Sequence, residues 1–268
     1  MALTFTATAE PPERLDLAAL VPAALAPLTR REIEGLVVGG GRRMPIRVGD
    51  VFRMSGAAGG DHLVIAGGSA RFDRVGAGLA GGRITVEGDV GARCGAEMLE
   101  GTIAVSGAAG PWAGAGMAGG TLTISGDTGE RAGGALPGRM AGMRGGVLTI
   151  GGAAGPRAGD RMRRGLLVAR AVGEDAGSRM IAGTLVAGAA GPRPGRLMRR
   201  GSLLLGGFEG EPLPTFLDCG VHDLGAVVLL ARWLDRLALP WRPRLGAPMR
   251  RLQGDTAALG KGEILVPG

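Results

Sequence analysis

The sequence predicts an all-β solenoid, a right-handed parallel β-helix in which each rung takes about 19 residues. The first observation is a phrase that returns through the middle of the chain, written apolar-x-apolar-x-G-x-x-G-x-x-x-G. The second is a glycine that marks the register of each copy, at spacings of 19, 19, 19, 26, 18 and 18 residues (Gly76, Gly95, Gly114, Gly133, Gly159, Gly177 and Gly195). A repeat of nearly fixed length predicts an array in which each unit contacts only its neighbours.

The residue types within one copy predict the kind of solenoid. Each copy opens with alternating apolar residues, as at Ile84/Val86 and Ile103/Val105, and this pattern predicts a short strand with one face inward. Glycines then follow too closely for a helix to propagate, but they suit tight corners with positive φ. A second inward column is expected from a later Met or Leu (Leu79, Met98, Met117, Met162, Met180 and Met198). Cys94 aligns with alanines of the other copies, so we expect it to be a small buried residue.

Three regions divide the chain. Residues 1–62 are expected to form a mixed N-terminal lead-in and cap with a short helix near 29–36, because the end of such an array is an open sheet edge. Residues 63–207 carry the repeats. Residues 208–268 are expected to form a C-terminal helix and tail, in which Asp223 caps a helix over 224–239 before Pro240. The broad apolar face of that helix predicts packing on the end or side of the solenoid, or on a partner subunit.

One copy carries an insertion near 135–143, where the spacing between register glycines rises to 26. Insertions in solenoids emerge as loops on one face, often the binding face. Pro137, Gly138 and the Met140/Met143 pair predict a compact loop with an apolar contact patch.

Composition narrows the class of protein. Glycine makes up 54 of 268 residues and aromatic residues only 3%, which excludes a core built on large rings but allows a narrow aliphatic one. The longest apolar stretch is too short to span a membrane, and the first residues lack a basic leader, so we expect a cytoplasmic protein with no membrane segment. A net charge of +7 could suit nucleic-acid binding, but the sequence carries no known nucleic-acid-binding motif, so no such partner is expected.

The chain offers few residues for chemistry of its own. His62 and His222 are its two histidines. His222 lies near Cys219 and two aspartates in DCGVHD, but the second Cys or His pair of a zinc site is missing, so a surface turn is expected there. We therefore predict neither catalytic residues nor a metal site.

The charge pattern is more informative. The position two residues before each register glycine is expected to stack into a column along one face, called here the arginine column (Arg74, Arg93, Trp112, Arg131, Arg157, Asp175 and Arg193). Like charges at rung spacing repel unless an anion or an acidic partner relieves them. A second basic patch is expected near other corners (Arg161, Arg163, Arg164, Arg196, Arg199 and Arg200). The alternative is that both are solvated, arginine-rich surface.

Specific stretches resemble a known family. The runs VGAGLAGGRITVEGDVGARCGAEMLEG and WAGAGMAGGTLTISGDTGERAGGALPGRMAGMRGG, with the tail GKGEILV, look like the C subunit of formylmethanofuran dehydrogenase and of its bacterial relative, the formyltransferase/hydrolase complex. The resemblance covers about 50–268. Because the repeat also resembles the C-terminal domain of glutamate synthase, a free-standing domain of that kind in ammonia assimilation stays open as the alternative. The insertion and the tail favour the first family.

The resemblance implies a non-catalytic structural subunit that assembles with subunits A, B and D. It also implies that the complex serves tetrahydromethanopterin-dependent one-carbon metabolism, in which formaldehyde is oxidised to formate. It implies that methylofuran or methanofuran serves the complex as carrier, that metals and any pterin lie on other subunits, and that no cofactor binds this chain tightly. Arginine supplies 30 of the 31 basic residues, a usage that favours the bacterial complex and methylofuran. Since carriers of this family have a glutamyl tail, six residues of the arginine column are candidate contacts for it (Arg74, Arg93, Trp112, Arg131, Arg157 and Arg193).

Overall fold

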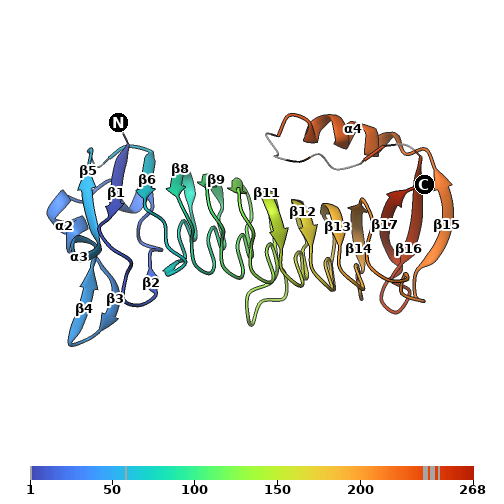
Figure 1. Ribbon diagram of the computed structural model, residues 1–268, viewed down its shortest axis with the longest axis horizontal. Coiled ribbons are helices and arrows are strands. Elements are labelled where there is room, and N and C mark those ends of the chain that lie inside the picture. The colour runs from blue at the N-terminus through green and yellow to red at the C-terminus, as the bar shows by residue number, and fades with distance from the viewer. Residues whose placement is uncertain (1, 58, 238–240, 242–244, 247) are drawn as a thin grey trace.

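The computed structural model describes residues 2–57, 59–237, 241, 245–246 and 248–268. Its main feature is a sheet of 13 strands in the order β15-β16-β17-β14-β13-β12-β11-β10-β9-β8-β6-β1-β5. Through the centre of the sheet the strand order follows the chain, and each turn of the chain places the next strand beside the last (Figure 1). The expected strand-rich fold with a large parallel sheet is confirmed.

The central strands are parallel throughout. Ile103 lies opposite Ile84, and Leu122 opposite Ile103, so adjacent strands are offset by 19 residues. The offset is 26 at the insertion, where Leu148 lies opposite Leu122. The strands are β6 (His62–Ala66), β8 (Ala80–Glu87), β9 (Glu100–Val105), β10 (Thr121–Ile124), β11 (Arg144–Ala154), β12 (Arg164–Val172), β13 (Thr184–Ala190) and β14 (Arg200–Leu205).

The core lies on the inward-facing side of these strands. The alternating residues predicted to face inward are buried, as are the methionines of the second inward column, and Cys94 is 0% exposed. One methionine differs from expectation: Met143, assigned to the surface patch of the insertion, is 0% exposed and lies in the core. Its rung takes its inward methionine from the end of the insertion, because the chain must refill the interior before β11 begins. The predicted apolar pair is therefore split, since Met140 is 82% exposed.

Tight corners connect the strands. At Gly95, where φ is +62°, an added Cβ would lie 2.8 Å from Cδ2 of Leu122, so both the backbone angle and the space demand glycine. Two residues earlier, Arg93 also has positive φ and donates its N–H to the carbonyl of Pro111 in the next rung over 2.8 Å. Such rung-to-rung bonds hold the corners in register.

A mixed segment covers the N-terminal end of the sheet. β1 (Leu3–Ala7) pairs in parallel with β6 and antiparallel with β5 (Phe52–Ser55). The helix expected at 29–36 is present as α2 (Arg30–Glu34), where Thr29 and Glu32 form a capping box. The remaining elements are β2 (Leu15–Asp16), α1 (Pro22–Leu25), β3 (Val37–Gly41), β4 (Met44–Arg47), α3 (Val48–Val51) and β7 (Phe72–Asp73).

At the other end the chain leaves the sheet and returns to it. β17 (Lys261–Pro267) pairs in parallel with β14, followed by antiparallel β16 (Met249–Gly254) and β15 (Leu217–His222). The surface turn expected around His222 is wrong, because these residues form the exposed edge strand β15. Backbone pairing with β16 decides the local structure here, and the local pattern of Gly and Asp carries no signal of that pairing.

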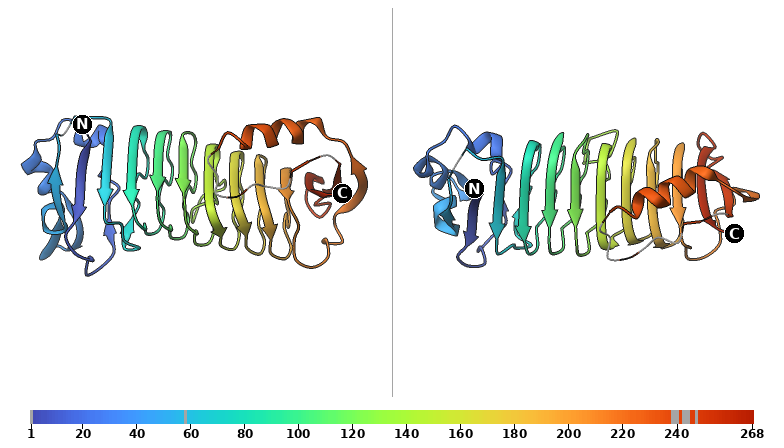
Figure 2. Two further views of the ribbon diagram at one scale, coloured as in Figure 1. Left: turned by 45° about the horizontal axis from the view of Figure 1, so that its top comes forward. Right: turned by 90° about the horizontal axis from the view of Figure 1, so that it is seen from above.

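The C-terminal helix α4 (Gly225–Leu234) lies on the side of the sheet (Figures 1 and 2). Val227 and Leu234 pack with aliphatic residues on the outer face of β12, β13, β14 and β17 (Val168, Val186, Leu204 and Leu265). The expected cap is wrong: Leu224 is the N-cap residue, and no side chain, Asp223 included, caps the helix. The predicted end at 239, with Pro240, lies outside the described residues.

Candidate functional site

The histidines, cysteines and acidic residues are the side chains on which a catalytic or metal site could be built. Within the described residues, no group of three or more His, Cys, Asp or Glu side chains is placed to hold a metal ion. His62 Nε2 lies 3.0 Å from the Thr85 hydroxyl, and His222 Nε2 lies 2.8 Å from the carbonyl of Cys219. Burial raises the pKa of the Cys94 thiol to about 12, so it does not form the nucleophilic thiolate near neutral pH. Of the helices in the described segments, none has the length and apolar character needed to cross a membrane.

The fold stacks the arginine column as its spacing predicts. All seven residues occupy the corner before the register glycine, with φ between 55° and 62°. The backbone N–H of Trp112 donates to the carbonyl of Glu130, and the backbone N–H of Arg131 donates to the carbonyl of Pro156, so the same bond recurs along the column. A non-glycine residue at positive φ is uncommon, and its recurrence at one corner follows from the repeat itself.

The side chains of the column differ in their partners. Arg74 binds Asp16 of the N-terminal cap over 2.6 Å, and Arg193 Nε donates to Asp175 over 2.9 Å. The hydrogen bond to Asp175 raises the pKa of Arg193. Arg131 lies 3.7 Å from a carboxylate oxygen of Asp160. Acidic residues of the same chain therefore relieve part of the repulsion expected along the column.

Two of these acids are buried. Asp160 is 1% exposed and accepts a hydrogen bond from the Ser178 hydroxyl over 2.9 Å, with Arg179 Nε at 3.4 Å. Asp175 is 2% exposed and has Arg196 at 3.7 Å as a second partner. The network was not predicted from the sequence. The sequence offers one signal for this network, the acidic residue Asp160 directly after a register glycine.

The middle of the column is more open. The Arg93 guanidinium lies 6.0 Å from the ring centroid of Trp112, within the range of a cation–π contact. The buried Nε1 of Trp112 has no hydrogen-bond partner. Among the described residues, none pairs with the Arg157 guanidinium. Arg93, Trp112 and Arg157 are thus the column members best placed to contact something outside the chain.

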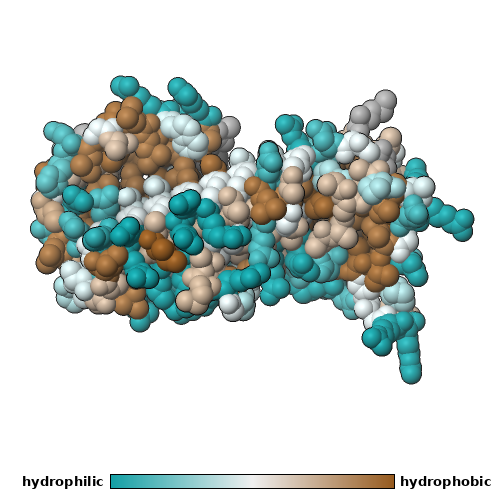
Figure 3. Space-filling view, turned by 180° about the vertical axis from the view of Figure 1, so that it is seen from behind, coloured by the Kyte–Doolittle hydropathy of each residue, from teal (hydrophilic) through white to brown (hydrophobic). Residues whose placement is uncertain are grey.

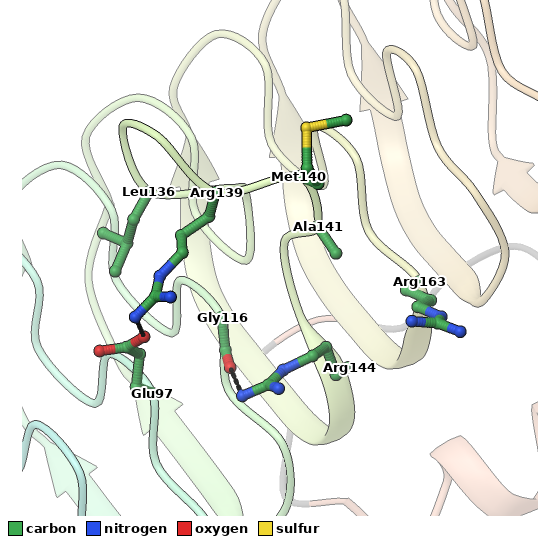
Figure 4. A pocket seen from close by; sticks show the side chains of 8 residues that line it. All are labelled: Glu97, Gly116, Leu136, Arg139, Met140, Ala141, Arg144 and Arg163. Atoms are coloured by element: carbon green, nitrogen blue, oxygen red, sulfur yellow. Dashed lines mark hydrogen bonds and ion pairs between the residues drawn. The ribbon is translucent and has the colours of Figure 1, made fainter.

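The insertion closes over a pocket of about 320 Å³. Arg139 reaches Glu97 over 2.9 Å, and Arg144 donates to the carbonyl of Gly116 over 3.5 Å (Figure 4). Met140 extends from the loop and is 82% exposed. The insertion therefore presents one exposed apolar side chain beside several arginines.

The second basic patch is split by the structure. Arg161 donates to the carbonyl of Arg139 in the insertion, and Arg196 lies beside Asp175. The other four arginines line one groove of about 340 Å³ (Arg163, Arg164, Arg199 and Arg200). Figure 3, in which the C-terminal end lies on the left, shows hydrophilic and hydrophobic side chains interspersed over that half of the face.

Comparison with known proteins places this scaffold. No protein-family model matches the chain. The C subunit of the formyltransferase/hydrolase complex Fhc from Methylorubrum extorquens is 59% identical over 256 residues, which are 96% of this chain and 96% of that protein. The crystal structure of the FhcABCD complex from Methylorubrum extorquens, in complex with methylofuran, matches with a TM-score of 0.93 and 49% identity over 99% of both chains.

The fold and the surface define the class of protein first: it is a long scaffold of parallel strands with charged residues at the corners. The match over nearly its whole length is more specific: the chain belongs to the family formed by the C subunits of formyltransferase/hydrolase complexes.

Proposed function

We propose that the chain is a non-catalytic structural subunit of a formyltransferase/hydrolase complex in tetrahydromethanopterin-dependent one-carbon metabolism, which oxidises formaldehyde to formate. The observation that carries the proposal is the 59% identity to the C subunit of Fhc over 96% of both chains. The chain joins subunits A, B and D and works in the cytoplasm as part of that assembly, in which metals and any pterin lie on other subunits. The free-standing glutamate synthase-like domain, the alternative, has no comparable support.

The proposed architecture is a right-handed parallel β-helix with rungs of about 19 residues. The offset of 19 between Ile84 and Ile103, repeated from Ile103 to Leu122, supports it. Its parts are a cap over 1–62, the β-helix over 63–207 with the insertion near 135–143, and a helix and tail over 208–268. A rigid rod of this kind suits a subunit that holds catalytic partners in fixed relation.

The proposed carrier is methylofuran, held by the complex and not tightly by this chain. The arginine column is the proposed contact for its polyanionic tail, through Arg74, Arg93, Trp112, Arg131, Arg157 and Arg193. Support is strongest at Arg93 and Arg157, since these guanidiniums have no carboxylate partner among the described residues. Exposed charge pairs contribute about 0–1 kcal/mol each, so the tail would be held loosely and could move.

Two measurements test the proposed function. Co-expressed with subunits A, B and D, the tagged chain should copurify with all three in a defined complex, identified by mass spectrometry. Purified alone, it should show no formyl transfer or hydrolysis. Copurification with flavin or iron–sulfur subunits would instead favour the glutamate synthase-like alternative, and turnover by the isolated chain at the rate of the complex would overturn the non-catalytic role.

A further inference from the structure

A groove crosses three successive rungs on the C-terminal half of the rod. Arg163 and Arg164 follow the inward methionine of one rung, and Arg199 and Arg200 follow that of the rung two steps on. In the rung between them, the same places hold Ile181 and Ala182. Hydrogen bonds fix this order, because Ile181 N–H donates to Met162 O over 2.8 Å and Arg199 N–H donates to Met180 O over 2.8 Å. We call this the arginine groove.

The charges of the arginine groove are uncompensated. All four arginines are exposed, and none of them forms an ion pair with another described residue. The arginine column differs, since three of its arginines have carboxylate partners of the same chain. No Asp or Glu among the described residues lines the groove, which also contains Leu259 at 43% exposure. Four like charges around an apolar floor repel each other unless a ligand supplies the negative charge.

The floor and the spacing restrict the ligand. A small inorganic anion could satisfy one arginine pair but would leave Ile181 and Leu259 uncovered. The two arginine pairs stand two rungs apart, roughly 9.6 Å at a strand spacing of about 4.8 Å. Along an α-helix, residues seven apart are separated by about 10.5 Å on one face, with a residue three or four positions on lying between them. Same-face residues of a strand recur at about 6.8 Å or 13.6 Å, which fits less well.

We infer that the arginine groove docks an α-helix of a partner subunit, through a face that carries an acidic residue, an apolar residue one turn on and a second acidic residue two turns on. The apolar residue covers Ile181 and Leu259, while the carboxylates reach the two arginine pairs. Charge-assisted, bidentate contacts of arginine with carboxylate supply both attraction and register. This inference rests on the proposed assembly with other subunits.

The first test compares charge reversals in the assembled protein. Replacing Arg163→Glu and Arg164→Glu together should weaken binding of this protein to its copurified partners about tenfold or more at low salt, measured by biolayer interferometry. The loss should shrink as the ionic strength rises to about 0.5 M. The matched control is Arg42→Glu with Arg43→Glu, in the exposed turn between β3 and β4 at the opposite end. It changes the charge equally and should leave affinity unchanged.

A second test does not depend on how the reversals fold. A photoreactive benzoylphenylalanine at Ile181, irradiated in the assembled complex, should crosslink to a helical segment of a partner with the acidic–apolar–acidic spacing, identified by mass spectrometry. Crosslinks only to a segment without that pattern would overturn the inference. So would unchanged affinity of the Arg163/Arg164 variant, or loss of bound carrier from that variant with assembly intact. Failure of the parent chain to join its partners would instead refute the proposed function.

Discussion

Arg193 donates a hydrogen bond over 2.9 Å to Asp175, its neighbour in the same corner column one rung earlier. The carboxylate is 2% exposed and also has Arg196 at 3.7 Å. One buried acid therefore anchors two arginines of the next rung, and the column is a set of internal ion pairs at this end rather than a uniform strip of free charge.

Replacing Asp175→Ala should lower the free energy of unfolding by about 1–3 kcal/mol, because it removes a buried acceptor that Arg193 and Arg196 share, and Arg193 keeps only the exposed Glu174 as a partner. The lower part of the range for broken buried pairs applies, since both guanidiniums are partly exposed. Urea unfolding followed by circular dichroism measures the change. Glu174→Ala is the matched control: Glu174 is exposed and lies 3.5 Å from Arg193, so its loss should cost less than about 1 kcal/mol. Equal effects would show that burial of Asp175 has no special role.

The two methionines of the insertion should behave oppositely. Met143→Ala should reduce stability by about 2–5 kcal/mol, because the buried side chain fills the core beneath β11. Met140→Ala should leave thermal stability unchanged, since that side chain is 82% exposed. Melting curves of the two variants provide the comparison. A stable Met143→Ala protein would mean that neighbouring rungs refill the space.

The repeat made the strands and inward columns predictable, because each rung presents the same residues to the same neighbours. Leu122 and Leu148 could be paired across the insertion for this reason, as the structure has them. Contacts that do not repeat were missed. Asp16 reaches Arg74 from 58 residues away, from within the N-terminal cap, and no periodicity relates the two. Met143 was misplaced because the insertion interrupts the register, so sequence spacing alone could not tell loop from core.

The two cysteines should differ in reactivity and in their effect on stability at high pH. Cys219 is exposed and should react with a thiol reagent in the native state, whereas Cys94 should react only after unfolding. Burial raises the pKa of Cys94 from 9.0 to about 12, so the native state favours the neutral thiol. The resulting stabilisation is complete below about pH 9 and falls as the pH rises toward 12, because the unfolded thiol ionises first.

Cys94→Ala should remove that part of the alkaline destabilisation, measured as unfolding midpoints at successive pH values. Alanine is the suitable replacement, since Ala113, Ala132 and Ala158 occupy the same inward position in other rungs, each fully buried. An identical pH profile in the parent and the variant would contradict the assignment to Cys94. Labelling of both thiols in the native protein would contradict the burial itself.

The proposed contact with the carrier tail is tested by charge reversal in the arginine column. Reversing Arg93, Arg131 and Arg157 together changes three of the six proposed contacts, but Arg131→Glu would place a new carboxylate near the buried Asp160. The cleaner variant is Arg93→Glu with Arg157→Glu. If each exposed contact contributes about 0–1 kcal/mol, the pair should lower formyl flux through the complex about fivefold at low ionic strength, with the effect shrinking as salt rises.

Hydrolysis of a short formyl substrate without a tail should be unaffected, because such a substrate has no tail to contact the arginine column. The matched control is Arg42→Glu with Arg53→Glu, two exposed residues of the N-terminal cap that form no ion pair with a described residue. It alters the charge by the same amount and should preserve flux. Equal flux in variant and parent at both low and high salt would indicate that the arginine column is solvated surface without a role in carrier binding. If the variant failed to assemble while the separate catalytic subunits kept their activity on the tail-less substrate, Arg93 and Arg157 would instead be assigned to a subunit interface.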